Sequence, residues 1–168
     1  MSLGLQEQLL AEFDREMGAT RRVLARVPDG SFAWTPHPRS RSLGALATHV
    51  ADLPRWIAHI VSEPSFDLSC VPAEPPVAPD AASVLARFER EVAEARRAVC
   101  AAVDTRLLET WSLLRDGRVL LTAPRIVAVR TEGLYHLVHH RGQLGVYLRL
   151  LGVPLPPVYG PTADEGRL

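Results

Sequence analysis

Largely apolar side chains recur at intervals of three and four residues along this chain, and that spacing constrains the fold more than any other feature. Because an α-helix turns once every 3.6 residues or so (about 100° per residue), such a spacing gathers these side chains into one stripe along the helix. The first stripe consists of Leu10, Phe13, Met17, Thr20, Leu24 and Val27. The second consists of Leu43, Leu46, Val50, Leu53, Ile57 and Ile60. Helices of this kind bury their stripes against one another, which predicts an all-α bundle.

Capping and helix-ending residues predict the bounds of the helices, which we place at about residues 3–27, 42–62, 81–103 and 125–151. Ser42 and Asp80 can cap the second and third helices, and Pro124 suits the first turn of the fourth. Gly152 ends the fourth helix. Pro54 lies inside the second stripe and predicts a kink or the start of a new segment.

The remaining segments are predicted to be connections. Residues 63–79 hold five prolines and form a connecting loop, and residues 154–168 form an irregular strap. Between the third and fourth helices, Asp116 and Gly117 separate two apolar runs, which predicts a short hairpin. With 168 residues in all, we expect a single domain, 1–168.

Charge and composition exclude several functions. The 19 basic residues are all arginines and are balanced by 19 acidic residues, so we expect no nucleic-acid partner. The absence of lysine excludes Schiff-base chemistry on a lysine side chain. No apolar run is long enough for a membrane span, and Cys70 and Cys100 form no metal-binding pattern. We therefore expect a cytoplasmic protein, while a single disulfide remains an open alternative.

The histidine pair His136 and His140 is the strongest sign of chemistry in the sequence. Residues four apart face the same way on a helix, so these imidazoles can bind one metal ion. On a helical wheel they share a narrow stripe with Gln143 and Tyr147, whereas His139 lies on the other side of His136 from the apolar face. Such a pair also arises by chance, so on spacing alone metal binding and a purely structural role remain about equally supported.

His49, beside the stripe of the second helix, can complete a three-histidine site if the second and fourth helices are neighbours. Three imidazoles would leave coordination positions open for water or substrate, as in catalytic rather than structural sites. A single histidine in this place is more often simply hydrogen-bonded. His59 is predicted to face solvent, and no periodicity places His37.

Several charged residues near these histidines are ambiguous. Asp52 and Glu132 are the nearest carboxylates in sequence and could act as a general base or orient a histidine. We expect both to be solvated instead. We also expect Arg141 and Arg149 to belong to a solvated face.

The chain resembles the DinB-like family in three places. Residues 135–144, with the sequence Tyr-His-Leu-Val-His-His-Arg-Gly-Gln-Leu, are similar to the family's C-terminal signature, and residues 156–165 to its tail. Upstream, residues 34–36 and 42–50 resemble its second-helix motif. The resemblance implies a four-helix bundle of DinB/YfiT type with a long crossover, a homodimer, and one zinc or nickel ion bound by His49, His136 and His140.

The resemblance leaves the activity open, since relatives include metal-dependent transferases that use a low-molecular-weight thiol. Such a thiol-dependent S-transferase, acting on a small electrophile, is the function we expect first, because a bound cation favours the thiolate. A metal-dependent hydrolase is the alternative enzyme. A non-catalytic bundle stapled by metal and a stress-response binding module are the alternatives outside catalysis. Residues 32–41 and 63–79, with Trp111, are expected to form the pocket walls, while no catalytic residue is assigned.

Overall fold

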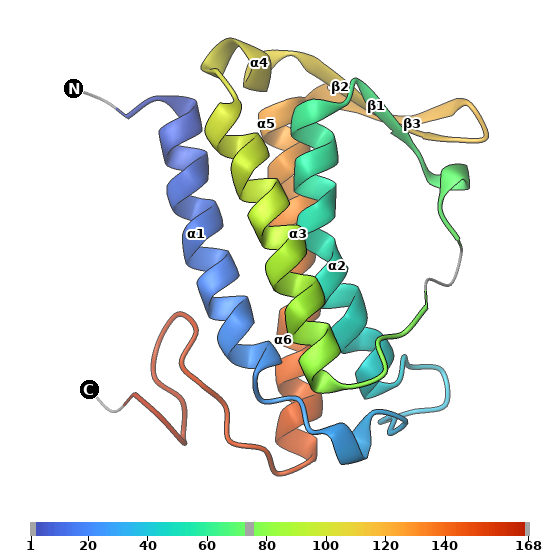
Figure 1. The fold of residues 1–168 in the computed structure, drawn as a ribbon, viewed down its shortest axis with the longest axis vertical. Helices are drawn as coiled ribbons and strands as arrows, with labels where there is room; N and C mark the ends of the chain where they lie inside the picture. Colours follow the sequence, from blue (N-terminus) through green and yellow to red (C-terminus); the bar gives the residue numbers. More distant parts are fainter. Residues whose placement is uncertain (1–2, 73–75, 167–168) are drawn as a thin grey trace.

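The computed structural model describes residues 3–72 and 76–166 and shows the expected helical bundle (Figure 1). Three of its long helices are α1 (Leu5–Leu24), α2 (Leu43–Ser62) and α3 (Ala81–Ala101). The fourth is built from three consecutive pieces: α5 (Arg125–Ala128), the π-helical segment η3 (Val129–Tyr135) and α6 (His136–Leu150). The short helix α4 (Asp104–Leu108) follows α3. The Ser42 hydroxyl accepts a hydrogen bond from the Ala45 amide, which confirms the predicted cap of α2.

The long crossover lies between α2 and α3. After α2 the chain returns along the outside of the bundle to the other end before α3 begins, so α2 and α3 run in the same direction (Figure 1). Asp80 ends this connection and caps α3, since its carboxylate accepts a hydrogen bond from the Ser83 amide at 2.7 Å. This arrangement confirms the four-helix bundle with one long crossover.

The predicted hairpin is present and belongs to a small three-stranded sheet. Strands β2 (Thr110–Arg115) and β3 (Arg118–Pro124) are antiparallel, and their turn has positive φ at Asp116 (52°) and Gly117 (74°). The sequence did not predict the parallel strand β1 (Ser65–Asp67), which pairs with β2. The carboxylate of Asp67 accepts hydrogen bonds from the amides of Asp116 and Gly117, so this strand also holds the hairpin turn.

The bundle core follows the two predicted stripes closely. Phe13 and Leu24 of α1 and all six stripe residues of α2 are buried. Pro54 does not begin a new segment, because α2 continues through it to Ser62. Trp111 is fully buried within the core, which corrects its expected place in a pocket wall.

Arg141 is the clearest correction to the predicted solvent-exposed surface. Its side chain is 4% exposed and forms an ion pair with Glu16 of α1 at 2.7 Å. It also donates hydrogen bonds to the Thr20 hydroxyl and to Tyr159 in the C-terminal strap. Arg141 therefore links α6 to α1 and to the strap, and a helical wheel cannot anticipate a charge that is buried through such distant partners.

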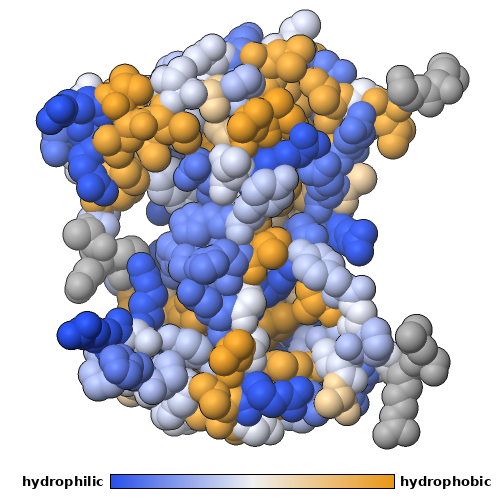
Figure 2. Space-filling view, turned by 180° about the vertical axis from the view of Figure 1, so that it is seen from behind, coloured by the Kyte–Doolittle hydropathy of each residue, from blue (hydrophilic) through white to orange (hydrophobic). Residues whose placement is uncertain are grey.

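The surface on the far side of the bundle is hydrophilic across its middle and more hydrophobic toward both ends (Figure 2). In the described part of the chain, no helix is both long and apolar enough to cross a membrane.

Candidate metal centre

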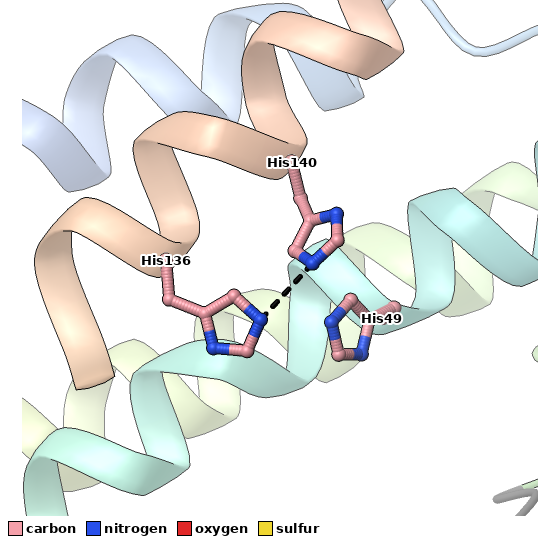
Figure 3. A group of neighbouring side chains, drawn as sticks. All are labelled: His49, His136 and His140. Atoms are coloured by element: carbon pink, nitrogen blue, oxygen red, sulfur yellow. Dashed lines mark hydrogen bonds between the residues drawn. The ribbon is translucent and has the colours of Figure 1, made fainter. Parts of the chain in front are cut away.

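Three half-buried histidines from two helices converge on one another (Figure 3). His49 lies on α2, while His136 and His140 lie one turn apart on α6. The Nε2 atoms of His136 and His140 are 3.0 Å apart, and one ligand atom from each of the three rings lies within 4.8 Å of the others. The structure thus brings together the three residues predicted to bind metal.

The close approach of α2 to the fourth helix allows this convergence. Gly133 lies in η3, three residues before His136, and a Cβ atom there would come within 2.5 Å of Ile57 Cγ1 on α2. Only glycine permits this contact. A π-helical segment has wider turns than an α-helix and is frequently found at functional sites. The sequence predicted a regular helix here, because neither the π-helical turn nor its partner on α2 changes the apolar spacing.

Gln143 fixes the orientation of the His140 ring. The Gln143 amide nitrogen lies 3.0 Å from His139 Nε2, and its oxygen lies 2.8 Å from His140 Nδ1. The oxygen can only accept a hydrogen bond, so the proton of His140 lies on Nδ1 and Nε2 keeps its lone pair. The helical wheel excluded His139 from the candidate ligands. His139 is exposed, and it supports Gln143 instead of binding metal.

His136 faces His140 through its Nε2 atom. Glu132 on the same helix raises the pKa of this ring against the larger lowering by burial. The two Nε2 atoms lie 3.0 Å apart, so at most one of them carries a proton and at least one presents a lone pair at this contact. A divalent ion bound by both nitrogens would take the place of that shared proton.

Burial keeps the three rings neutral. Burial lowers the pKa of His49 from its ordinary 6.5 to about 3, with further lowering by His140, Arg41 and His136. Burial is also the main cause that lowers the pKa values of His136 and His140. Neutral imidazole is the form that binds metal ions.

The residues present fit a divalent ion. Tetrahedral zinc with nitrogen ligands at about 2.0–2.1 Å requires these nitrogens to be about 3.3 Å apart, so only small side-chain rotations separate the present spacing from that arrangement. Among the described residues, no carboxylate or cysteine joins the cluster, so exogenous groups would complete the coordination.

Two cavities flank the histidines. One has a volume of about 480 Å³ and is lined by Arg39, Ser40, Arg41, Leu46, His140, Gln143, Val146 and Tyr147. The other is smaller, about 160 Å³, mostly apolar, and lined by Arg41, His49, Asp52, Leu53, Arg55, Trp56, His59, Phe66, Val71 and Pro72. As predicted, residues from both connecting loops form part of these walls.

Other candidates from the sequence lie elsewhere or differ from expectation. His59 is half-buried in the smaller cavity, with its ring 5.1 Å from that of Phe66, so the expectation that it faces solvent is wrong. The wheel could not foresee β1, which carries Phe66 over this face of α2. His37 is exposed in its loop, and its Nδ1 accepts a hydrogen bond from the Arg39 amide.

The carboxylates also differ from each other. Asp52 is buried and forms an ion pair with Arg87 of α3, so its expected solvation is wrong. Even with this ion pair, burial raises the pKa of the Asp52 carboxyl above its ordinary value. Glu132 is partly exposed, and its contribution raises the pKa of His136. Cys70 and Cys100 are exposed free thiols.

Comparisons with known proteins agree on one family. The sequence profile of the DinB superfamily matches residues 12–144, and that of the DinB family matches residues 133–167. A DinB-like protein from Bacillus cereus ATCC 10987 has a similar structure, with a TM-score of 0.72 and 21% identity over 89% of this chain and 95% of its own. A DinB-like protein from Bacillus subtilis gives a TM-score of 0.68 and 16% identity over 96% and 99%. No curated protein sequence matches the chain.

Proposed function

The chain belongs to the DinB superfamily, and we propose that it binds one divalent metal ion through His49, His136 and His140 and transfers a low-molecular-weight thiol to a small electrophile. The observation that carries the metal site is the 3.0 Å approach of the Nε2 atoms of His136 and His140, with the His49 ring beside them. Zinc and nickel both suit imidazole ligands.

The chemistry supplied by the ion would be to favour the thiolate form of a bound thiol, which is the nucleophilic form. The chain contributes the rest. Gln143 keeps His140 in the tautomer with a free Nε2. Trp56 and Phe66, whose ring centroids are 4.7 Å apart, form an apolar wall that holds the electrophile and excludes water.

The proposed reaction is a substitution at carbon. The thiol sulfur forms a bond to the electrophilic carbon, the bond from that carbon to its leaving group breaks, and the leaving group departs with the electron pair. The thiol proton passes to solvent. The protein needs no cysteine of its own for this step, which agrees with the positions of Cys70 and Cys100 outside the cavities.

The alternatives have less support. Hydrolysis calls for a general base, but Asp52, the carboxylate that lines a cavity beside the histidines, is engaged by Arg87. A structural staple would close the site with a fourth protein ligand, and the described residues provide three. Exposed apolar residues along the fourth helix, such as Tyr135, Val146 and Leu150, support the further proposal of a homodimer.

A conjugation assay tests the transferase. Zinc- or nickel-loaded protein is mixed with a small thiol and 1-chloro-2,4-dinitrobenzene, and formation of the thioether is followed by absorbance. We expect metal-dependent turnover that His140→Ala abolishes and His37→Ala leaves unchanged. Turnover of nitrophenyl esters without thioether formation would favour the hydrolase, and metal binding without either reaction would favour the staple.

A further inference from the structure

We propose that the ligand of this site carries a carboxylate group and that Arg41 binds this group beside the histidines. The inference rests on the proposed function only in taking the histidine centre as the place where the ligand reacts. It adds the chemical class of the ligand and the residue that recognises it.

Arg41 lies where the two cavities meet. It lines the larger cavity together with His140 and Gln143, and the smaller one together with His49. Its positive charge acts on all three histidines, since it contributes to lowering the pKa of each. A molecule that reaches the histidines from either cavity therefore enters a space that Arg41 lines.

Among the residues that the structure describes, none is a partner of the Arg41 guanidinium. Within residues 3–72 and 76–166 it forms neither an ion pair nor a hydrogen bond, and the same holds for the side chains of Arg39 and Arg55 in the cavity walls. Of the described residues that line these walls, Asp52 alone carries a carboxylate, and it forms an ion pair with Arg87 instead. The cavities thus hold an excess of positive charge, which a divalent ion at the histidines would increase and an anionic ligand would offset.

The backbone of Arg41 is nevertheless held in place. The Tyr147 hydroxyl on α6 donates a hydrogen bond to the Arg41 carbonyl at 3.3 Å, and the Tyr147 ring packs edge-on against Trp34 at 5.6 Å. The Leu43 amide at the start of α2 donates to the Trp34 carbonyl at 2.8 Å. The loop is therefore attached to both helices that carry the histidines, and the side chain it presents remains available for a ligand.

Arginine suits a carboxylate better than other anchors would. Its planar guanidinium can donate two parallel hydrogen bonds to the two carboxylate oxygens, and such charge-assisted pairs are stronger than neutral ones. A ligand bound in this way would point its reactive end toward the histidines. Arg41 would then determine which thiols or electrophiles the site accepts.

Paired ligands that differ only in charge test this role. Zinc-loaded wild type, Arg41→Gln and Arg118→Gln are titrated calorimetrically with 3-mercaptopropionate and with 3-mercaptopropionamide, and metal content is measured in each sample. Arg118→Gln is the matched control, because Arg118 is an exposed arginine on the hairpin outside both cavities. Wild type and the control should bind the carboxylate about tenfold more tightly than the amide. Arg41→Gln should lose this preference while keeping its zinc and its affinity for the amide.

Equal affinities in wild type, or a preference that survives in Arg41→Gln, would overturn the proposal. A pair without sulfur, 4-phenylbutyrate and 4-phenylbutyramide, separates this result from the thiol chemistry. If neither mercapto compound binds, the proposal of thiol transfer fails. The role of Arg41 is then decided by the second pair alone: wild type should prefer 4-phenylbutyrate to 4-phenylbutyramide, and Arg41→Gln should not.

Discussion

Gly133 packs against Ile57 so closely that a Cβ at position 133 would lie 2.5 Å from Ile57 Cγ1. This contact joins η3 to α2 immediately before the fourth helix presents His136. The spacing between the two helices therefore determines both the packing of the core and the geometry of the histidine cluster.

Gly133→Ala should weaken both the packing of the core and the geometry of the histidine cluster. The added methyl group has to displace a fully buried side chain, which costs about 1–3 kcal/mol of unfolding free energy. It should also lower metal affinity, since α6 moves away from His49. Urea unfolding and a metal titration measure the two effects. Gly142→Ala is the control, because position 142 is exposed on α6 with open space around its Cβ, and it should raise stability by up to about 1 kcal/mol. Equal stabilities of the two variants would show that the contact at Ile57 is unimportant.

Gln143→Leu should reduce metal affinity about 10- to 100-fold without unfolding the protein. The leucine cannot accept a hydrogen bond from His140 Nδ1. The ring therefore loses the contact that keeps its proton on Nδ1 and leaves Nε2 free. Gln143→Glu, which keeps an acceptor oxygen, should restore most of the affinity. His139→Ala removes only the support for Gln143 and should have a smaller effect. Competition with a chromogenic chelator measures all three, and an unaltered affinity in Gln143→Leu would exclude this orienting role.

The metal-free protein should lose stability in mild acid. Because the pKa of folded His49 lies near 3, below its ordinary 6.5, the unfolded chain takes up the proton first as the pH falls. The contribution of neutral His49 to the free energy of unfolding is therefore fully present above about pH 6.5. Below that pH it declines, by up to about 1.4 kcal/mol per pH unit for this one ring. Urea unfolding in EDTA at pH 7.5 and pH 5 measures the decline. His49→Ala should make it shallower, and an identical decline in that variant would assign the effect to other groups.

Arg141→Ala and Arg149→Ala should differ sharply, although both arginines were expected on a solvated face. Arg141 is buried against Glu16, so its loss leaves an uncompensated charge and costs about 3–5 kcal/mol. The ion pair of Arg149 with Asp164 is largely exposed and contributes at most about 1 kcal/mol. Thermal or urea unfolding compares the two variants, and similar losses would mean that burial of Arg141 carries no energetic weight.

The features that followed from the sequence are those set by local spacing. The stripes of α1 and α2, the cap at Ser42 and the hairpin turn at Asp116 and Gly117 depend on neighbouring residues, so periodicity and turn chemistry predicted them. His136 and His140 belong to the same class, since four residues on one helix determine their relative position.

The features that did not follow depend on contacts between distant segments. Burial of Asp52 requires Arg87 on α3, and the place of His59 in a cavity requires β1. The position of His49 beside the pair was inferred on the condition that the second and fourth helices are neighbours, and the structure meets that condition through Gly133 and Ile57. The role of His139 was missed because it acts through Gln143 rather than through a metal ion.

Metal analysis of purified protein tests the central claim most directly. Wild type, His49→Ala, His136→Ala and His140→Ala are loaded with zinc or nickel, dialysed and measured by inductively coupled plasma mass spectrometry, with His59→Ala and His37→Ala as controls of the same type. The account predicts about one ion per chain in wild type and both controls, and a loss in each of the other three variants. Equal metal content in wild type and all variants would contradict it.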